Sequence, residues 1–273
     1  MWFDKLATNG FNKLPFGFCR IKHVPEKVDI LCFFDKWQNE MLNFKGMRFP
    51  VEVILVCIRW YAAYPLSTRH LEEMMEERGV LVDHSTVSRW AIRFLPLLEK
   101  IFRKHKRPVG GSWRMDETYI KVNGDWKYLY RAVDKEGKTV DFLLTAKRDK
   151  AAAMRFFDKA MRDNDLPEKV TMDQCGANKA AIDQIIEDKN ISVIVRQVKY
   201  LNNIVEQDHR AVKRVTRPML GFKSFRSARN ILAGVELMHM IGKGSTAHGR
   251  NRHDVFCRPI LCTGRTGPFR LRS

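Results

Sequence analysis

The apolar positions between residues 50 and 95 predict three helices in succession. Apolar side chains recur there at three- and four-residue steps, which is the spacing of one helical face. Pro65 separates the first helix from the second, and Ser67 is well placed to cap the second. Gly79 ends the second helix, and Ser85 is a candidate cap for the third. The three apolar stripes are formed by Val53, Ile54, Cys57, Ile58 and Tyr61, then Leu71, Met74 and Met75, then Val87, Trp90, Ala91, Phe94 and Leu95.

The second and third predicted helices, joined by a short turn that contains glycine, are typical of a helix-turn-helix. The residues of such a unit that read DNA lie near the N-terminus of its second helix. In this sequence that position holds Ser85, Thr86, Ser88 and Arg89, which we predict to bind DNA. An ordinary antiparallel helix pair would show the same pattern, so the pattern alone leaves both interpretations open.

After residue 111 the pattern changes to one of strands. Three β-prone segments cover residues 113–122, 126–133 and 139–145, and Asn123-Gly124 between the first two favours a hairpin. Further along we expect a helix over 150–163, a short strand over 169–172, a helix over 178–188, a buried strand over 191–195 and a helix from 202 through 214. Hairpin-linked strands followed by alternating helices and strands describe a mixed sheet covered by helices. This order predicts an α/β fold of ribonuclease-H-like architecture, preceded by a small all-helical domain.

We therefore expect five segments along the chain. They are an N-terminal extension at 1–43, a helix-turn-helix domain at 44–103, a basic linker at 104–111, a ribonuclease-H-like domain at 112–243 and a basic, irregular tail at 244–273. Met41 offers an alternative start to the protein. The tail contains His248, His253, Cys257 and Cys262, but their spacing fits none of the usual zinc patterns.

The charge balance indicates what kind of partner the protein binds. Lys and Arg number 49 against 31 Asp and Glu, which gives a formal net charge of +18. Such an excess indicates a polyanionic partner, with nucleic acid as the first candidate and an anionic membrane as the second. The six cysteines are scattered and do not form a disulfide framework, and the start of the chain lacks a signal-peptide pattern. We therefore expect a cytoplasmic protein that does not enter a membrane.

Three carboxylates stand at positions that this fold would bring together. Asp116 lies within the first strand, Asp173 at the end of the short strand 169–172, and Glu206 in the first turns of the last helix. The first and fourth strands are neighbours in a ribonuclease-H-like sheet, and the last helix can place a carboxylate across them. A site made of oxygen ligands suits Mg²⁺ or Mn²⁺ rather than zinc. Two such ions roughly 4 Å apart can activate a water or a 3′-hydroxyl and stabilise the leaving oxygen at phosphorus.

Each of the three carboxylates also has an alternative, purely structural explanation. Asp116 is disfavoured in a strand and so asks for a reason, whereas Glu117 beside it would point to the opposite face. Asp173 could cap a turn. Glu206 could pair with a basic residue four positions on, and Asp208 is a rival on a different side of the same helix.

Several long motifs resemble one known family. They are Gly110-Gly-Ser-Trp-Arg-Met-Asp-Glu-Thr-Tyr-Ile-Lys-Val122, Trp126-Lys-Tyr-Leu-Tyr-Arg-Ala-Val-Asp134 and Lys199-Tyr-Leu-Asn-Asn-Ile-Val-Glu-Gln-Asp-His209, with further likeness in Leu71–Gly79, Asp83–Val87 and Gly221–Phe225. The chain resembles bacterial insertion-sequence transposases of the DDE class, in the insertion-sequence-six family of the retroviral-integrase-like superfamily. The resemblance runs from about Phe44 to Lys243.

The resemblance implies a function and assigns roles to residues. It implies metal-dependent cleavage and joining of DNA strands with two divalent ions, Mg²⁺ or Mn²⁺, and recognition of terminal inverted repeats. The catalytic and metal-binding roles would fall on Asp116, Asp173 and Glu206. A basic residue seven positions after the Glu contacts the transposon end in related enzymes. The corresponding basic stripe here is Arg210, Lys213, Arg214 and Arg217, which a solvated helix face would also explain.

The sequence departs from the family at two points and leaves alternatives open. Gln174-Cys175 stands where the family has Lys after the second Asp, and Glu206 follows Asp173 at a slightly shorter distance than expected, a shortening that we assign to a loop at 188–190. The alternatives are a DNA-binding remnant or repressor without catalysis, and a nuclease for RNA–DNA hybrids. The expected partners are duplex DNA, as transposon ends and target, and further copies of the chain, because the reaction must hold two ends. Such a bacterial protein would associate with the nucleoid.

Overall fold

The computed structural model describes residues 42–198 and 203–244. The predictions for the N-terminal extension before residue 42, including the start at Met41, lie outside these residues. So do the predictions for the basic tail beyond residue 244 and for its histidines and cysteines. Within the described ranges, no helix is both long and apolar enough to cross a membrane.

The three predicted N-terminal helices are present. They are α2 (Val51–Ala63), α3 (Thr68–Glu76) and α4 (His84–Arg103). Ser67 caps α3 as predicted, accepting a hydrogen bond from the His70 amide. The predicted cap of α4 was wrong, because the helix begins at His84 and its cap is Asp83. The Asp83 carboxylate accepts hydrogen bonds from the amides of Ser85 and Thr86, which places Ser85 inside the first turn.

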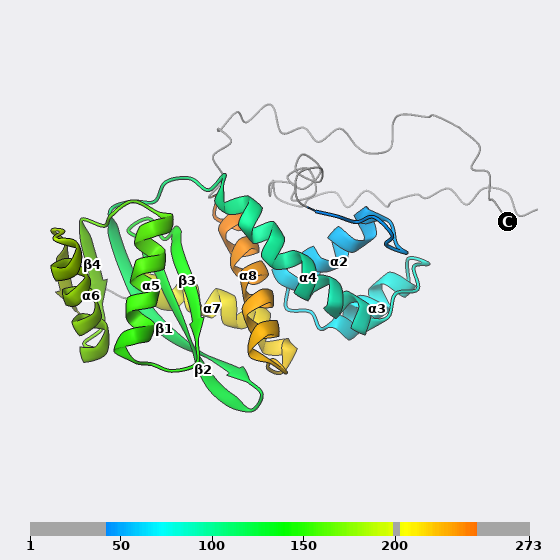
Figure 1. The fold of residues 1–273 in the computed structure, drawn as a ribbon. Coiled ribbons are helices and arrows are strands. Elements are labelled where there is room, and N and C mark those ends of the chain that lie inside the picture. The colour runs from blue at the N-terminus through cyan, green and yellow to red at the C-terminus, as the bar shows by residue number, and fades with distance from the viewer. Residues whose placement is uncertain (1–41, 199–202, 245–273) are drawn as a thin grey trace, which may run out of the picture.

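A five-stranded mixed sheet follows the helices (Figure 1). Its strands are β1 (Ser112–Val122), β2 (Asp125–Asp134), β3 (Thr139–Thr145), β4 (Lys169–Met172) and β5 (Ile194–Gln197), in the spatial order β3-β2-β1-β4-β5. β1, β2 and β3 pair antiparallel, whereas β4 and β5 run parallel to β1. Asn123 and Gly124 form the predicted hairpin turn with φ angles of 51° and 86°. This topology confirms the ribonuclease-H-like fold.

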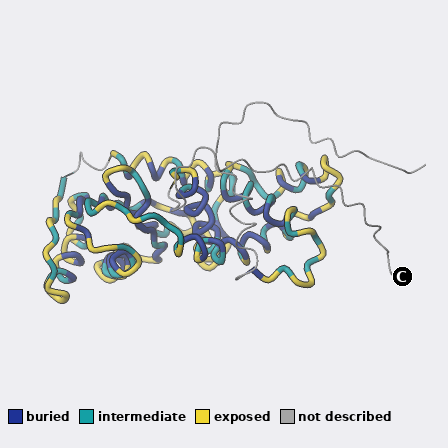
Figure 2. Tube along the Cα trace, turned by 90° about the horizontal axis from the view of Figure 1, so that it is seen from above, coloured by how far each residue is buried: buried dark blue, intermediate teal, exposed yellow. Residues whose placement is uncertain are grey.

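Helices cover both faces of the sheet. One face is packed by α5 (Lys150–Asp163) and α6 (Gly176–Lys189), whose apolar side chains share a core with Trp113, Met115 and Tyr130. The other face is packed by α7 (Asn203–Thr216) and α8 (Phe225–Gly242), with a short 3₁₀ helix η2 (Arg217–Met219) between them. In the view from above, the buried segments lie in the interior of the fold and the exposed ones on its outside (Figure 2).

Helix α8 belongs to two structural units at once. It packs on the sheet, and it also packs against α4 and α2, so that one apolar cluster extends from the N-terminal helices to the sheet. The contact with α4 is close, because a Cβ built on Gly234 would lie 2.5 Å from a methyl of Leu95. The N-terminal helices therefore share their core with residues from the far end of the described chain.

Two expectations for the second half of the sheet were wrong in detail. β5 begins at Ile194 rather than residue 191, and it is an edge strand rather than a buried one, with Ile194 55% exposed. An edge strand has a neighbour on one side only, so apolar residues do not guarantee its burial. The expected loop at 188–190 is also mostly helical, since α6 continues to Lys189 and ends at Asn190, whose φ is 48°.

Candidate active site

The register of β1 and β4 brings Asp116 and Asp173 side by side on neighbouring strands. Met115 pairs with Met172 in parallel, and each aspartate is the next residue along the chain. Asp173 directly follows the end of β4. Its Oδ1 accepts a hydrogen bond from the Gln174 amide at 2.8 Å, and its carbonyl accepts one from the Cys175 amide at 2.7 Å. These bonds hold Asp173 in a turn between β4 and α6.

Helix α7 lies against β1 and carries Glu206. His209 on this helix is buried, and its Nε2 lies 3.3 Å from Oδ2 of Asp116. Glu206 precedes His209 by three residues and so lies one helical turn away on the same side of α7. The Glu206 side chain is exposed, and the Asp116 side chain is 21% exposed. The strands set Asp116 beside Asp173, and α7 carries Glu206 one turn before the histidine that contacts Asp116.

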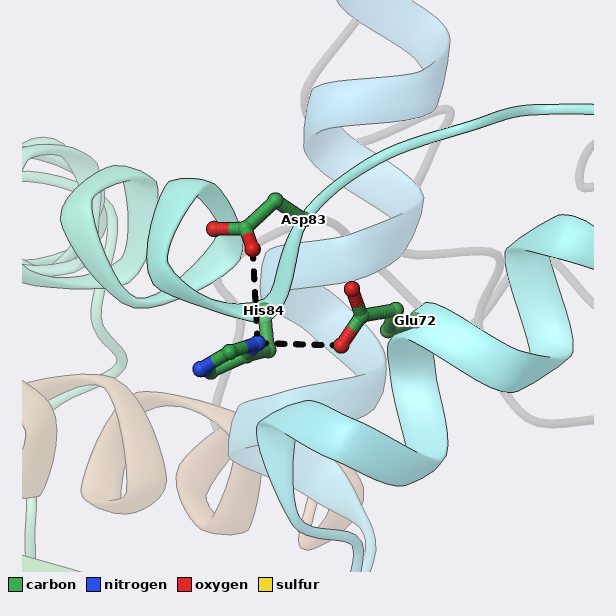
Figure 3. A group of neighbouring side chains, drawn as sticks. All are labelled: Glu72, Asp83 and His84. Atoms are coloured by element: carbon green, nitrogen blue, oxygen red, sulfur yellow. Dashed lines mark hydrogen bonds and ion pairs between the residues drawn. The ribbon is translucent and has the colours of Figure 1, made fainter.

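The three carboxylates are not gathered at ligand distance. Among the described residues, only Glu72, Asp83 and His84 bring three such donor atoms within 4.8 Å of one another (Figure 3). In that group His84 Nδ1 lies 3.0 Å from Glu72 Oε2 and 3.4 Å from Asp83 Oδ2. All three side chains are more than a third exposed. Asp83 caps α4, and the contact of His84 with Glu72 joins α4 to α3, so these contacts have a structural role.

The surroundings of Asp116 fit a divalent cation. The three carboxylates offer oxygen donors only, the set that Mg²⁺ and Mn²⁺ prefer. Beside them, His209 Nε2 is buried without a hydrogen-bond partner, because its contact with Asp116 is not aligned as a hydrogen bond. Since Arg131 Nη1 lies 3.4 Å from His209 Nδ1, that nitrogen accepts and Nε2 carries the proton. A proton donor without a hydrogen-bond partner therefore lies beside Asp116.

Glu117 lies on the opposite face of β1 from Asp116, as strand alternation predicts. Its side chain is 4% exposed and lies toward α5 and α6. There its Oε1 accepts hydrogen bonds from Arg148 Nε at 2.9 Å and from the Asn178 side chain at 3.0 Å. This contact ties the loop before α5 to α6 on the opposite face of β1.

A buried network of charges behind Asp116 was missed by the sequence analysis. Arg131, the partner of Asp116 across the β1–β2 ladder, is fully buried. Its Nη2 donates to Asp208 Oδ2 at 2.6 Å, and its Nε and Nη2 donate to Glu236 at 2.6 and 2.9 Å. Asp208 also accepts from His239, at 2.6 Å, and from Lys243. The one sequence signal was an arginine within the apolar run Leu129–Val133.

The network lowers the pKa of Asp208. Burial by itself would raise the pKa of this carboxyl, but the hydrogen bond from His239 and the charges of Arg131 and Lys243 outweigh it. The pKa therefore lies well below its usual range. Asp208 stays charged and is occupied by these three partners, which separates it from Glu206 on the exposed side of α7.

The predicted basic stripe lies on the walls of one open groove. Arg210, Lys213, Arg214 and Arg217 are all exposed, and all four line a hollow of about 1270 Å³. The hairpin between β1 and β2 forms the opposite wall and contributes three aromatic side chains, Tyr119, Trp126 and Tyr128. Sequence analysis identified the cations but not the aromatic wall, because the two are brought together only by the packing of α7 against β1.

The predicted DNA-reading residues lie in the first turns of α4. Ser85 and Arg89 are exposed, whereas Thr86 and Ser88 are partly buried. Arg89 donates to the Thr86 hydroxyl at 3.0 Å, which orients its guanidinium along the helix. The four residues are therefore near one another at a helix N-terminus, as a helix-turn-helix requires.

Comparisons with known proteins give a consistent result. A family model described as a DDE domain matches residues 110–245. The chain is 40% identical over 205 residues to the "Transposase for insertion sequence-like element IS431mec" of Staphylococcus aureus, covering 74% of this chain and 90% of the relative. It is 39% identical, with the same coverage, to the transposase of element IS257 in transposon Tn4003 of Staphylococcus aureus. Among solved structures, the integrase catalytic core domain of HTLV-2 in complex with magnesium is 16% identical, with a TM-score of 0.34, over 42% of this chain and 75% of that chain.

Proposed function

The chain belongs to the insertion-sequence-six family of DDE transposases and is thus a polynucleotidyl transferase, and we propose that Asp116, Asp173 and Glu206 form its catalytic triad. The proposal includes binding of the terminal inverted repeats of an insertion sequence, followed by metal-dependent cleavage and transfer of the DNA strands. The observation that carries it is the parallel pairing of Met115 with Met172, which sets two aspartates side by side next to the strand against which α7 packs.

The triad residues would hold the divalent ions. When bound, such ions supply an activated water or 3′-hydroxyl and stabilise the charge on the leaving oxygen. Asp116 is fixed within β1 and Asp173 directly after β4, whereas Glu206 is exposed on its helix. The three carboxylates are too far apart to share an ion. We therefore propose that the exposed Glu206 side chain moves toward Asp116 when the ions bind.

The chain's own residues would handle the DNA. The basic residues that follow Glu206 along α7 and into η2 would bind the phosphates next to the reacting one; they are Arg210, Lys213, Arg214 and Arg217. The exposed side chains at the start of α4 would read the repeat in the major groove. His209 would offer its free Nε2–H beside Asp116 to a phosphate oxygen or a water.

Two wider features complete the proposal. The reaction joins two DNA ends, so the working form would be an oligomer on DNA. Its substrate is chromosomal or plasmid DNA, so the protein would act in the bacterial cytoplasm at the nucleoid. These statements follow from the reaction and remain proposals for this chain.

Strand transfer of a pre-cut transposon end into plasmid DNA tests the triad. Wild type should join the strands with Mg²⁺ or Mn²⁺, and Asp173→Asn should bind the end without joining it. Asp183→Asn is the matched control, because Asp183 is an exposed aspartate on α6 that pairs with Lys179, and this variant should retain activity. End binding without joining by wild type would favour the remnant or repressor, and would direct attention to Gln174-Cys175.

A further inference from the structure

The groove between α7 and the β1–β2 hairpin exposes a cluster of aromatic side chains. Trp126 is 61% exposed and Tyr119 is 48% exposed, although large aromatic residues usually seek burial. Their rings are 6.5 Å apart at 81°, and Tyr119 lies 5.4 Å from Tyr128. An aromatic cluster that the protein's own core does not cover is free to contact another molecule.

The charge of the groove indicates the kind of molecule. Besides the basic stripe of α7 and η2, Lys121 of the hairpin lines the same hollow. None of the described residues that line it is acidic. Five cations with no opposing carboxylate favour a polyanion, and flat aromatic faces among them favour a polyanion with flat bases.

The walls of the groove are held in place. Phe222 donates its amide to the Lys121 carbonyl at 3.0 Å, and Asn123 donates to the Phe222 carbonyl at 2.7 Å. Gly221, with φ of 92°, allows this approach, since a Cβ there would lie 3.3 Å from the Lys121 carbonyl. The segment after α7 is thereby fastened to the hairpin edge, so the groove exists before any ligand arrives.

We propose that this groove binds unpaired nucleotides at the end of the DNA, with bases stacked on Trp126 and Tyr119 and phosphates held by the cations of α7. The bases of an intact duplex stack on one another, so an aromatic face finds a base only at an end or in an unpaired stretch. Arg210 lines the groove and lies one helical turn beyond Glu206, so such nucleotides would be next to the reacting phosphate. The inference rests on the proposed function and specifies the substrate of that site.

Equilibrium binding in EDTA tests the inference without any chemistry. The probes are two fluorescein-labelled duplexes that share one sequence, which is unrelated to any transposon end. One duplex is blunt and the other carries a short unpaired thymidine tail. Fluorescence anisotropy of the full chain should show tighter binding to the tailed probe. Trp126→Ala should weaken binding to the tailed probe roughly tenfold and leave the blunt probe nearly unchanged, because stacking is lost and charge is not.

Three further variants sharpen the result. Trp126→Phe keeps an aromatic face and should retain most of the preference for the tail. Arg217→Ala should also weaken binding to the tailed probe, since it removes a phosphate contact within the groove. Leu166→Ala, which removes a side chain that is 53% exposed outside the groove, should change neither.

Other outcomes would overturn the inference. Equal affinity of wild type for both probes, or equal weakening of both by Trp126→Ala, would contradict stacking. A smaller mass in sedimentation for Trp126→Ala without DNA would instead assign the aromatic face to a contact between copies of the chain. Because no ion is present, failure here is distinct from failure of the triad in the strand-transfer assay.

Discussion

The guanidinium of Arg131 and the carboxylate of Glu236 form a two-pronged ion pair in which neither side chain is exposed. The pair joins β2 to α8, directly behind Asp116 on the neighbouring strand. Arg131 also holds Asp208, so the same guanidinium fixes α7. A buried pair adds little net stability over an apolar core, but removing one partner leaves an uncompensated charge. The network therefore fixes the position of α7 and α8 against the sheet.

Glu236→Gln should lower the free energy of unfolding by about 3 kcal/mol, because Arg131 keeps its charge and loses one of its carboxylates. Urea denaturation followed by circular dichroism measures the change. Glu136→Gln is the matched control: Glu136 pairs with Lys138 at the surface, and no measurable change is expected. Equal effects of the two changes would contradict the importance of the buried pair.

Glu206→Gln and Asp208→Asn should have opposite consequences, although the two residues are nearly adjacent. Glu206 is exposed and does not contact the buried charges around Arg131. Its variant should therefore lose strand transfer and keep its melting temperature. Asp208 holds Arg131, His239 and Lys243, so its variant should melt at a lower temperature. Strand transfer and thermal denaturation are measured on both. Loss of transfer only in Asp208→Asn would move the catalytic role to that residue.

Lys213→Ala should weaken binding of duplex DNA of any sequence to a similar extent. Each phosphate contact releases about one counterion, so the slope of log affinity against log salt should fall by about one. Anisotropy titrations between low and moderate salt give the slope. Lys179→Ala on the far helix α6 should leave it unchanged, and an unchanged slope for Lys213→Ala would place Lys213 away from the DNA.

Gly234→Ala should destabilise the protein by about 1–3 kcal/mol, because the added methyl meets Leu95 at a distance that real side chains do not tolerate. Gly242→Ala is the control on the same helix, since nothing lies within 4 Å of a Cβ there. Chemical denaturation compares the two. Recovery of stability in the double variant Gly234→Ala/Leu95→Ala relative to Leu95→Ala alone would assign the loss to this one contact.

Asp141 should make stability depend on pH in the acid range. Burial would raise the pKa of its carboxyl, but the charges of Lys159 and Arg103 outweigh burial and hold the pKa below its usual value. A lowered folded-state pKa means that the unfolded chain binds the proton first, so the stabilisation is present above about pH 4 and is lost as the pH falls below it.

The measurement for Asp141 compares urea midpoints of wild type and Asp141→Asn from pH 7 downward. The variant should be less stable by about 3 kcal/mol at pH 5 to 7, and the difference should shrink below about pH 4. A difference that stays constant across the range would show that Asp141 acts through its shape and hydrogen bonds rather than its charge.

The local elements and the fold class followed from sequence patterns. Apolar spacing predicted α2, α3 and α5, and the strand that ends before Asp173 was placed to the residue. Ser67 as a cap and Asn123-Gly124 as a turn were confirmed, because each acts through hydrogen bonds or backbone angles within a few residues. The assignment of the triad remained a prediction that the family resemblance supports.

The tertiary structure alone decided which distant residues meet. Arg131 and Glu236 are 105 positions apart, and Arg131 and Asp208 are 77 apart, distances over which no local signal acts. The exposure of Trp126 and the edge position of β5 likewise depend on what else covers the sheet. Periodicity shows which face of a helix or strand is apolar and which is polar. Only the packing of the elements decides what each face lies against.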